Sequence, residues 1–542
     1  MTATLSSEGG PSDESAQPAG QPEQAPPAGM DEGGSGSGSG SGDGPGERSG
    51  RRRLLDPAMP TDRLFGWLGP LAVTLLAAIL RFDKLTQPAA IVGGKVTYTF
   101  DEVYYTKDAH DLLAFGVERG DRCVGPGFVV HPPLGKWLMA VSEWLFGYIR
   151  CDGTAYRDPA LGWRFASAVV GTLAVLILAR TARRMFRSTM LGCFAGLIFA
   201  LDGLEFVHSR IGILDIFLLF WTVAALGCLV ADRDWLRTAL ATGAPGRAVL
   251  WRPWRIGCGL CLGAALATKW SGGYSVVAFA ALALAWDVGA RRSAGGRPLL
   301  SWASRDLPAW AAAFLVLPFV VYTASWTGWF VTDTGYDRAG RSGITGVLKG
   351  WWAYHGDIRR FHDSLTTNHP YESNNPFAWL ILHRPVAFSY TGSEVGQNGC
   401  TSPGGCSSEV LDLGNPAVWW IGTLALIAML GLWLVRRDWR AALVLVGFAL
   451  NFAPWLLFPG RTKFIFYALP LLPFIVLALT AVAALVLGPP GNRPNRRISG
   501  ALVVGLYALV VLGLFAFFHP IWVGDTIPTS AWDARIWFQK WI

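Results

Sequence analysis

Blocks of roughly 18 to 25 apolar residues recur along the chain, and their length limits what it can fold into. A helix of about 20 residues crosses the roughly 30 Å hydrocarbon core of a bilayer. Apolar residues make up 52% of the 542 residues and charged residues only 15%, whereas soluble proteins carry about a quarter. A soluble helical core would need helices with a polar face, which stretches such as 417–435 and 501–518 lack. The sequence therefore predicts an all-α integral membrane protein.

Hydropathy predicts about eleven transmembrane helices. The expected spans are 64–82, 161–180, 189–204, 211–231, 256–270, 273–289, 307–330, 416–435, 441–458, 463–487 and 498–518. The segment HPPLGKWLMAVSEWLFG, which starts at His131, is short and amphipathic. We expect it to lie as a helix at the outer interface, with a true span as the alternative. Two large external loops result, 83–160 and 331–415.

Basic residues between the spans predict the orientation, because cytoplasmic loops are enriched in Lys and Arg. A cytoplasmic N-terminus places five arginine-bearing loops inside, namely 180–187, 233–255, 291–305, 436–440 and 493–497. An odd number of spans then places the C-terminus outside. We expect a multi-pass protein of the cell membrane in contact with membrane lipids. The net charge of +8 is explained by these loops, so nucleic acid is not an expected partner.

The first 55 residues differ in composition from the rest of the chain. They are rich in Gly, Ser, Pro, Glu and Asp and contain a GSGSGSGSG run from Gly34. Such a segment cannot bury enough apolar surface to offset its ordering entropy. We expect residues 1–55 to be a disordered cytoplasmic tail and 56–542 to be the membrane domain. The tail lacks the short apolar core of a signal peptide.

Four of the eight cysteines fall in the expected external loops, where disulfides can persist. Cys123 with Cys151 and Cys400 with Cys406 are the natural pairings, and four unpaired thiols are the alternative. Zinc binding is less favoured because no close CxxC pair lies outside the membrane. The other four cysteines lie within expected spans and suit packing.

Charged residues near the outer ends of the spans are the candidates for chemistry, because such placement is costly without a purpose. The adjacent carboxylates of Asp101 and Glu102 could provide a general base, although an isolated pair also suits a solvated loop. Lys136 is one of few lysines and stands at headgroup height. Lys136 has two possible roles: it binds a specific phosphate group, or its side chain only snorkels to the lipid headgroups in general.

Three further segments carry charge at the outer side. In LDGLEFVHSRIGILD, Arg210 can bind two phosphate oxygens at once. Glu205 and His208 share a helix face there, which permits a metal pair, but no third ligand is evident and ion pairing is favoured. Arg461 and Lys463 stand outside against the positive-inside tendency, and a lipid phosphate would explain them. Lys269 and Trp270 occupy a similar external turn.

Six segments together resemble the protein O-mannosyltransferase family, a branch of the GT-C glycosyltransferases, and most closely its actinobacterial members. In chain order they are FDEVYY, HPPLGKWL, the 205–215 stretch, ATKWSGG, NHPYESNNPFAWLILHRP and GRTKFIFYALP. The resemblance runs from about residue 64 to 520. It implies a GT-C fold with a catalytic first external loop.

The resemblance also implies residue roles. Asp101 would be the general base and Glu102 would help to hold the acceptor. The donor phosphate would be bound by Lys136, Arg210, Arg461 and Lys463. This assignment rests partly on the charge of these residues and on their predicted position at the outer side of the membrane. We expect the donor and acceptor pocket to include five further residues, His131, Glu205, Asp215, Lys269 and Trp270. No metal ligand set is expected.

The implied reaction transfers mannose, with inversion, from polyprenyl-phosphate-mannose to Ser or Thr hydroxyls of secreted proteins outside the membrane. The donor is a substrate rather than a cofactor, and metal dependence stays open. The secretion translocon is a further candidate partner. Two alternatives remain: a GT-C transferase of an arabinose or aminoarabinose type, and a lipid-linked sugar transporter, which would carry inverted repeats.

Overall fold

The computed structural model describes residues 60–242, 247–366, 369–373, 375–489, 491 and 493–542. The tail expected over residues 1–55 lies outside this part of the chain, so its expected disorder stays a prediction.

Within the described residues, nine helical segments are long and apolar enough to cross a membrane. They are α2 (Phe65–Phe82), α5 (Pro159–Phe186), α8 (Asp215–Thr242), α10 (Gly272–Ser293), Leu307–Ser325, α16 (Pro416–Arg436), Trp439–Leu457, Ile465–Leu487 and α19 (Pro494–Val523). Two shorter helices, α6 (Thr189–Ala200) and α9 (Pro253–Thr268), occupy the places of the other two expected spans. The protein is a multi-pass helical membrane protein, and the count of eleven stays a prediction.

Three of the nine segments change helical type along their length. Leu307–Ser325 consists of α12 (Leu307–Ala311), a π-helical turn and α13 (Leu317–Ser325). α17 (Trp439–Phe452) continues as the 3-10 turn η4 (Ala453–Leu457). The 3-10 helix η5 (Ile465–Leu471) continues as α18 (Leu472–Leu487), and the bend coincides with Pro470 and Pro473 because proline breaks the hydrogen-bond ladder.

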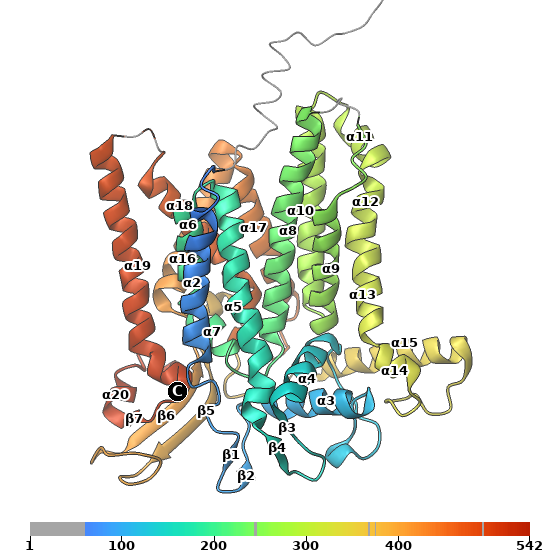
Figure 1. The fold of residues 1–542 in the computed structure, drawn as a ribbon, viewed down its shortest axis with the longest axis vertical. Coiled ribbons are helices and arrows are strands. Elements are labelled where there is room, and N and C mark those ends of the chain that lie inside the picture. Colours follow the sequence, from blue (N-terminus) through green and yellow to red (C-terminus); the bar gives the residue numbers. More distant parts are fainter. Residues whose placement is uncertain (1–59, 243–246, 367–368, 374, 490, 492) are drawn as a thin grey trace, which may run out of the picture. The chain divides into compact units, whose positions relative to one another are not determined.

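Most of the elements between the spans gather at one end of the bundle, the lower end in Figure 1, whereas α11 (Pro298–Arg305) lies at the upper end. Those at the lower end include the helices α3 (Glu102–Phe115), α4 (Leu134–Phe146), α14 (Thr327–Val331) and α15 (Gly343–Ser364). α15 runs across the direction of the bundle helices (Figure 1). The segment from His131 forms the 13-residue α4, too short for a span. Segments 83–160 and 331–415 thus share one end.

The all-α expectation omitted small antiparallel sheets at this end. β1 (Ile91–Val92) pairs with β2 (Lys95–Val96), and β3 (Gly147–Ile149) pairs with β4 (Ala155–Arg157). A three-stranded sheet has the order β5 (Val386–Ser393), β6 (Cys406–Asp412) and β7 (Ile527–Pro528). Short connections complete the fold: α7 (Gly203–His208), α11 (Pro298–Arg305), α20 (Thr529–Asp533), η1 (Asp121–Cys123), η3 (Pro376–Ile381) and η6 (Gln539–Trp541).

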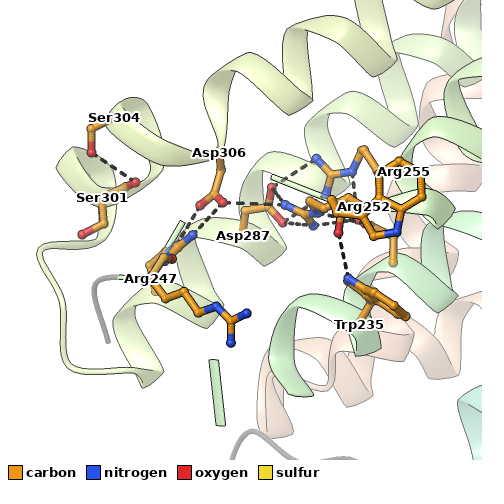
Figure 2. A network of polar contacts seen from close by, with 11 residues as sticks. Trp235, Arg247, Arg252, Arg255, Asp287, Ser301, Ser304 and Asp306 are labelled. Atoms are coloured by element: carbon orange, nitrogen blue, oxygen red, sulfur yellow. Dashed lines mark hydrogen bonds and ion pairs between the residues drawn. The ribbon is translucent and has the colours of Figure 1, made fainter. Parts of the chain in front are cut away.

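At the opposite end, arginines and aspartates form a buried network, drawn in Figure 2. Arg252, directly before α9, and Arg255 of α9 each bridge Asp232 of α8 and Asp287 of α10, with contacts of 2.6 to 3.1 Å. Beside them, Arg291 and Asp306 pair at 2.8 Å. All six side chains are nearly inaccessible to solvent. Three of the arginines that served as orientation signals are therefore neutralised inside the protein and expose no charge.

Candidate active site

Asp101 stands immediately before α3, in a conformation that its neighbour helps to fix. Phe100 adopts a positive φ of 52°, a region that non-glycine residues rarely occupy. The Phe100 ring stacks on Phe388 at a centroid distance of 4.7 Å and contacts the edges of Phe464 and Phe466. This aromatic packing from two distant segments holds the turn. The half-buried Asp101 makes no side-chain capping bond to α3, so its carboxylate is available to a ligand.

A cavity of about 1140 Å³ opens beside Asp101. Five separate parts of the chain line it, and a single cavity of this volume can enclose a sugar phosphate and part of a lipid chain. The lining parts are the start of α3, the segment before α4 with the first turn of α4, the α9–α10 turn, the end of α15 with the residues after it, and the segment 455–467. Their charged and imidazole side chains are Asp101, Asp108, His131, Lys136, Lys269, Arg359, His362, Asp363, His369 and Arg461.

Burial controls the protonation of Asp101. It raises the pKa of the carboxyl group to about 6, while the nearby Lys269 lowers the pKa and Asp215 raises it. A general base works best when its pKa lies near the operating pH. Asp101 therefore has the position and the proton affinity of a base.

Lys269 brings a positive charge to the same cavity. It follows α9, and its Nζ lies 2.9 and 3.0 Å from the two carboxylate oxygens of Asp215 at the start of α8. The ammonium group also lies 5.1 Å from the ring centre of Tyr467. Asp215 supports Lys269 and is not itself among the cavity-lining residues. Trp270 lines the cavity and donates its indole N–H to the Tyr322 hydroxyl at 2.9 Å.

Arg461 and His362 lie together in the cavity lining. The guanidinium Nη2 of Arg461 lies 3.2 Å from Nδ1 of His362, on the last turn of α15. His131 packs near the His362 ring at 5.6 Å and near Tyr105 at 6.0 Å. Burial lowers the pKa of His131 well below its usual value, and the surrounding cations lower it further. His131 is therefore neutral at physiological pH.

Lys136 lines the cavity, but its charge is already balanced. Its Nζ contacts Asp108 at 3.3 Å and Glu118 at shorter range. Although burial lowers the pKa of Lys136, these two carboxylates outweigh it and raise the pKa. Its assignment to donor phosphate stays a prediction, because phosphate would have to compete with both acids.

Glu102 points away from the cavity into the protein, where it is fully buried. Its carboxylate accepts two hydrogen bonds from Arg164, at 2.8 and 3.0 Å, and two from the backbone N–H groups of Thr99 and Gly212. Glu102 therefore fixes the start of α3 beneath Asp101. The buried position of Glu102 does not support the expectation that its side chain helps to hold the acceptor.

Arg210 also lies outside the cavity lining. Its guanidinium donates to the carbonyl groups of Leu80, Arg81, Asp83 and Lys84 at 2.6 to 3.1 Å. These carbonyls belong to the C-terminal end of α2 and the residues after it, where a helix leaves its acceptors unpaired. Arg210 is thus a capping residue rather than a phosphate ligand in this structure.

Glu205 and Lys463 are likewise occupied by the protein itself. Glu205 is fully buried against Arg81, and His208 lies 3.2 Å from Asp412 instead of sharing a ligand with Glu205. The Nζ of Lys463 donates to the carbonyls of Phe458 and Arg461 at 2.6 and 3.0 Å. Lys463 therefore shapes the loop that carries Arg461.

Both expected cysteine pairs are joined as disulfides, Cys123–Cys151 and Cys400–Cys406. The first lies beside a second cavity, of about 610 Å³, on the other side of α3. Among the described residues, the one group with metal-ligand geometry is His110 with Cys123 and Cys151. The two sulfur atoms of this group form the Cys123–Cys151 disulfide, so neither cysteine can provide a thiolate ligand to a metal ion.

Sequence reasoning did not identify His362 or the aromatic walls that Tyr105 and Tyr467 provide. A signal for His362 existed, since α15 carries an apolar stripe that ends beside it. Its partner, Arg461, lies 99 residues away, and nothing local indicates that pairing.

Two family profiles match the chain. The one described as dolichyl-phosphate-mannose-protein mannosyltransferase covers residues 126–330, and the one described as the C-terminal four TMM region of protein-O-mannosyltransferase covers residues 347–541.

Individual proteins are similar over most of their length. The polyprenol-phosphate-mannose–protein mannosyltransferase of Mycolicibacterium smegmatis is 38% identical over 508 residues, which cover 89% of this chain and 94% of the relative. The enzyme of the same name from Corynebacterium glutamicum is 31% identical, covering 86% and 92%. The S. cerevisiae protein O-mannosyltransferase Pmt1-Pmt2 complex bound to the sugar donor superimposes with a TM-score of 0.69 at 16% identity, covering 92% and 94%. That likeness shows the GT-C fold, and the sequence matches establish that this chain belongs to the protein O-mannosyltransferase family.

Proposed function

We propose that this chain transfers mannose from polyprenyl-phosphate-mannose to Ser or Thr hydroxyls of secreted proteins. One observation carries the proposal: a single cavity combines the half-buried carboxylate of Asp101 with the cations Lys269 and Arg461. The names of the curated relatives support the donor and the protein acceptor. They favour mannose over the arabinose alternatives, and a transferase over a transporter.

In this mechanism Asp101 is the general base. A Ser hydroxyl is a weak nucleophile at neutral pH, and a positioned carboxylate removes its proton as the oxygen attacks the anomeric carbon. Such help is worth about 10²–10⁴-fold in rate, or about 3–5 kcal/mol. The bond from the anomeric carbon to the phosphate oxygen breaks as the bond to the acceptor oxygen forms, which inverts the anomeric centre.

The departing lipid phosphate leaves as an anion and needs no proton from an acid. Fixed cations stabilise the charge that develops on it. Arg461 is the first candidate for this role, because a guanidinium matches two phosphate oxygens. Lys269 is the second, since its pairing with Asp215 holds it at the cavity wall. Glu102 fixes the start of α3 beneath Asp101, and Arg210 caps the end of α2.

The same proposal places the cavity on the outer face of the plasma membrane. The N-terminus and the tail 1–55 would be cytoplasmic and the C-terminus external. This arrangement is supported by the gathering of both large loops at one end of the bundle (Figure 1), since each loop contains one of the two disulfides. Acceptor chains would then meet the cavity as they emerge from the secretion translocon.

The test uses purified protein in vesicles with polyprenyl-phosphate-[³H]mannose and a Ser/Thr peptide. Wild type should transfer label to the peptide, and Asp101→Asn should lower transfer by about 10²-fold or more. Asp121→Asn, an exposed aspartate in the same external segment, is the matched control and should stay active. Transfer by Asp101→Asn at the wild-type rate would remove the base assignment. If the wild type transferred no mannose but did transfer a pentose from the corresponding lipid-linked donor, the assignment of mannose as the sugar would be wrong.

A further inference from the structure

The helix α15 packs against the rest of the protein through the residues on one of its faces. Its buried side chains Trp351, Tyr354 and Ile358 pack in a cluster with Trp326 and Trp329. The opposite face exposes Ile344, Leu348 and Trp352, which recur at helical spacing. This side chain pattern places α15 as a wall between the cavity and the surroundings, and its last turn adds Phe361 and His362 to the cavity lining.

His362 contacts two other walls of the cavity at once. Its Nδ1 lies 3.2 Å from the guanidinium of Arg461, and its Nε2 lies 3.2 Å from the carbonyl oxygen of Val130, beside His131. A guanidinium can only donate and a carbonyl can only accept. The partners therefore assign one tautomer, in which neutral His362 accepts at Nδ1 and donates at Nε2.

Burial keeps His362 in this neutral form. Burial, followed by the charges of Arg461 and Lys269, lowers the pKa of His362 to about 4, although the Val130 carbonyl and Asp363 act in the opposite direction. Protonation would remove the acceptor for Arg461 and would place two cations in contact. At neutral pH the imidazole thus serves Arg461 as a fixed acceptor.

Arg461 depends on such an acceptor because its side chain has many rotamers to lose. The ring of Trp455, 6.0 Å from the guanidinium carbon, gives it one supporting face. Among the described residues its Nε has no hydrogen-bond partner. A guanidinium anchored at Nη2 by His362 therefore keeps donors free for an anionic ligand.

We propose that His362 is a positioning residue that orients Arg461 towards the phosphate of the lipid-linked donor. This inference rests on the proposed function and adds a residue of α15 to it. His362 itself would not touch the reacting atoms.

The test separates the KM for the donor from that for the acceptor. His362→Ala should raise the donor KM by roughly tenfold, the usual effect of losing a hydrogen bond to a charged group. The acceptor KM should change by less than about twofold, since His362 acts through Arg461. His362→Asn should restore much of the donor KM, because the Asn Oδ1 can take the place of Nδ1. His383→Ala, at an exposed histidine outside the cavity, is the matched control.

A double-mutant cycle identifies the partner. Arg461→Ala should raise the donor KM, and adding His362→Ala to it should have little further effect. If His362→Ala raised the donor KM by the same factor in the wild type and in the Arg461→Ala variant, the positioning role of His362 would be wrong. So would equal damage by the Asn and Ala variants when both reach vesicles folded, as judged by size-exclusion chromatography, contradict that role.

The same experiment separates this inference from the function. If wild type transfers mannose but Arg461→Ala keeps its donor KM, the inference falls and the transferase stands. If wild type transfers no sugar from the polyprenyl-phosphate donor, both fall.

Discussion

Asp101 and Glu102 are adjacent in sequence but have opposite environments. Successive side chains on a helix diverge by about 100°, so at the start of α3 one carboxylate faces the cavity and the other faces the interior. Glu102 receives four hydrogen bonds from fixed donors. Asp101 is left for the substrate. In the proposed function the pair is therefore a base on a rigid support rather than two equivalent acids.

The raised pKa of Asp101 predicts the acid limb of the pH profile. A base must be ionised to accept a proton, and the ionised fraction falls as the pH drops through the pKa, which burial raises to about 6. We expect kcat/KM to fall tenfold per pH unit below this point, because this parameter reports groups of the free enzyme. Initial rates at subsaturating donor, measured between pH 4.5 and 8, check it. An acid limb centred near pH 4, the usual range for aspartate, would contradict the burial argument.

At the scale of elements, α3 is held from several directions. Glu102 ties its start to Arg164 of α5, and Asp108 on it pairs with Lys136 of α4. The Cys123–Cys151 disulfide joins the segment after α3 to the turn between β3 and β4. Short interfacial helices bury little surface of their own, so these cross-links carry much of the precision of the site.

The two disulfides should differ in their effect on stability. In the chain-entropy account, a disulfide stabilises more when it closes a longer loop. Cys123 and Cys151 are separated by 28 residues, and Cys400 and Cys406 by 6. We expect the double variant Cys123→Ser with Cys151→Ser to lower the free energy of unfolding by about 3 kcal/mol. The loss for the double variant Cys400→Ser with Cys406→Ser should be smaller than this by about 1 kcal/mol. Thermal unfolding in detergent, followed by tryptophan fluorescence, measures the order of the two midpoints.

Activity provides the second readout for the same pairs. The first disulfide borders the segment that follows α3, whereas the second closes the β5–β6 hairpin. Loss of Cys123–Cys151 should therefore reduce transfer more than loss of Cys400–Cys406. The reverse order would show that the hairpin, rather than α3, controls the cavity.

Across the whole molecule, charge is arranged differently at the two ends of the bundle. The end with α3 and α15 leaves Asp101 and Arg461 open to a cavity. The other end contains the buried network of Figure 2, in which three arginines match three aspartates. A buried network of this kind joins helices in a fixed order and offers no binding group to solvent.

Removing one acid from that network should destabilise the fold without changing the chemistry. Asp287→Asn leaves Arg252 and Arg255 without one of their two buried counter-charges, a loss worth about 3–5 kcal/mol. The thermal midpoint in detergent should fall, while the transfer rate per folded molecule should stay near wild type. Asp337→Asn, which breaks an exposed pair with Arg341, is the matched control, and its cost should stay below about 1 kcal/mol. A large drop in the specific rate of folded Asp287→Asn would mean that the two ends are coupled.

The membrane spans could be predicted from sequence because apolar length is a local property. Each of the eleven expected spans corresponds to a helical segment, and α6 and α9 are shorter than the others. The strands β1 to β4 were missed because two- and three-residue strands leave no periodic pattern, and the longer β5 and β6, of 8 and 7 residues, were missed as well. At the site, Asp101, Lys269 and Arg461 were found because charge beside an apolar block is conspicuous.

Sequence alone determined that this chain is a helical membrane protein and which charged segments stand at the ends of its helices. Tertiary structure alone decided which of those charges face the cavity. Arg210 caps α2 across more than 120 residues of sequence, and His362 reaches Arg461 across 99. The physical reason is that apolar burial is summed over neighbouring residues, whereas a hydrogen bond needs two groups within about 3 Å, and only the folded chain brings distant residues that close.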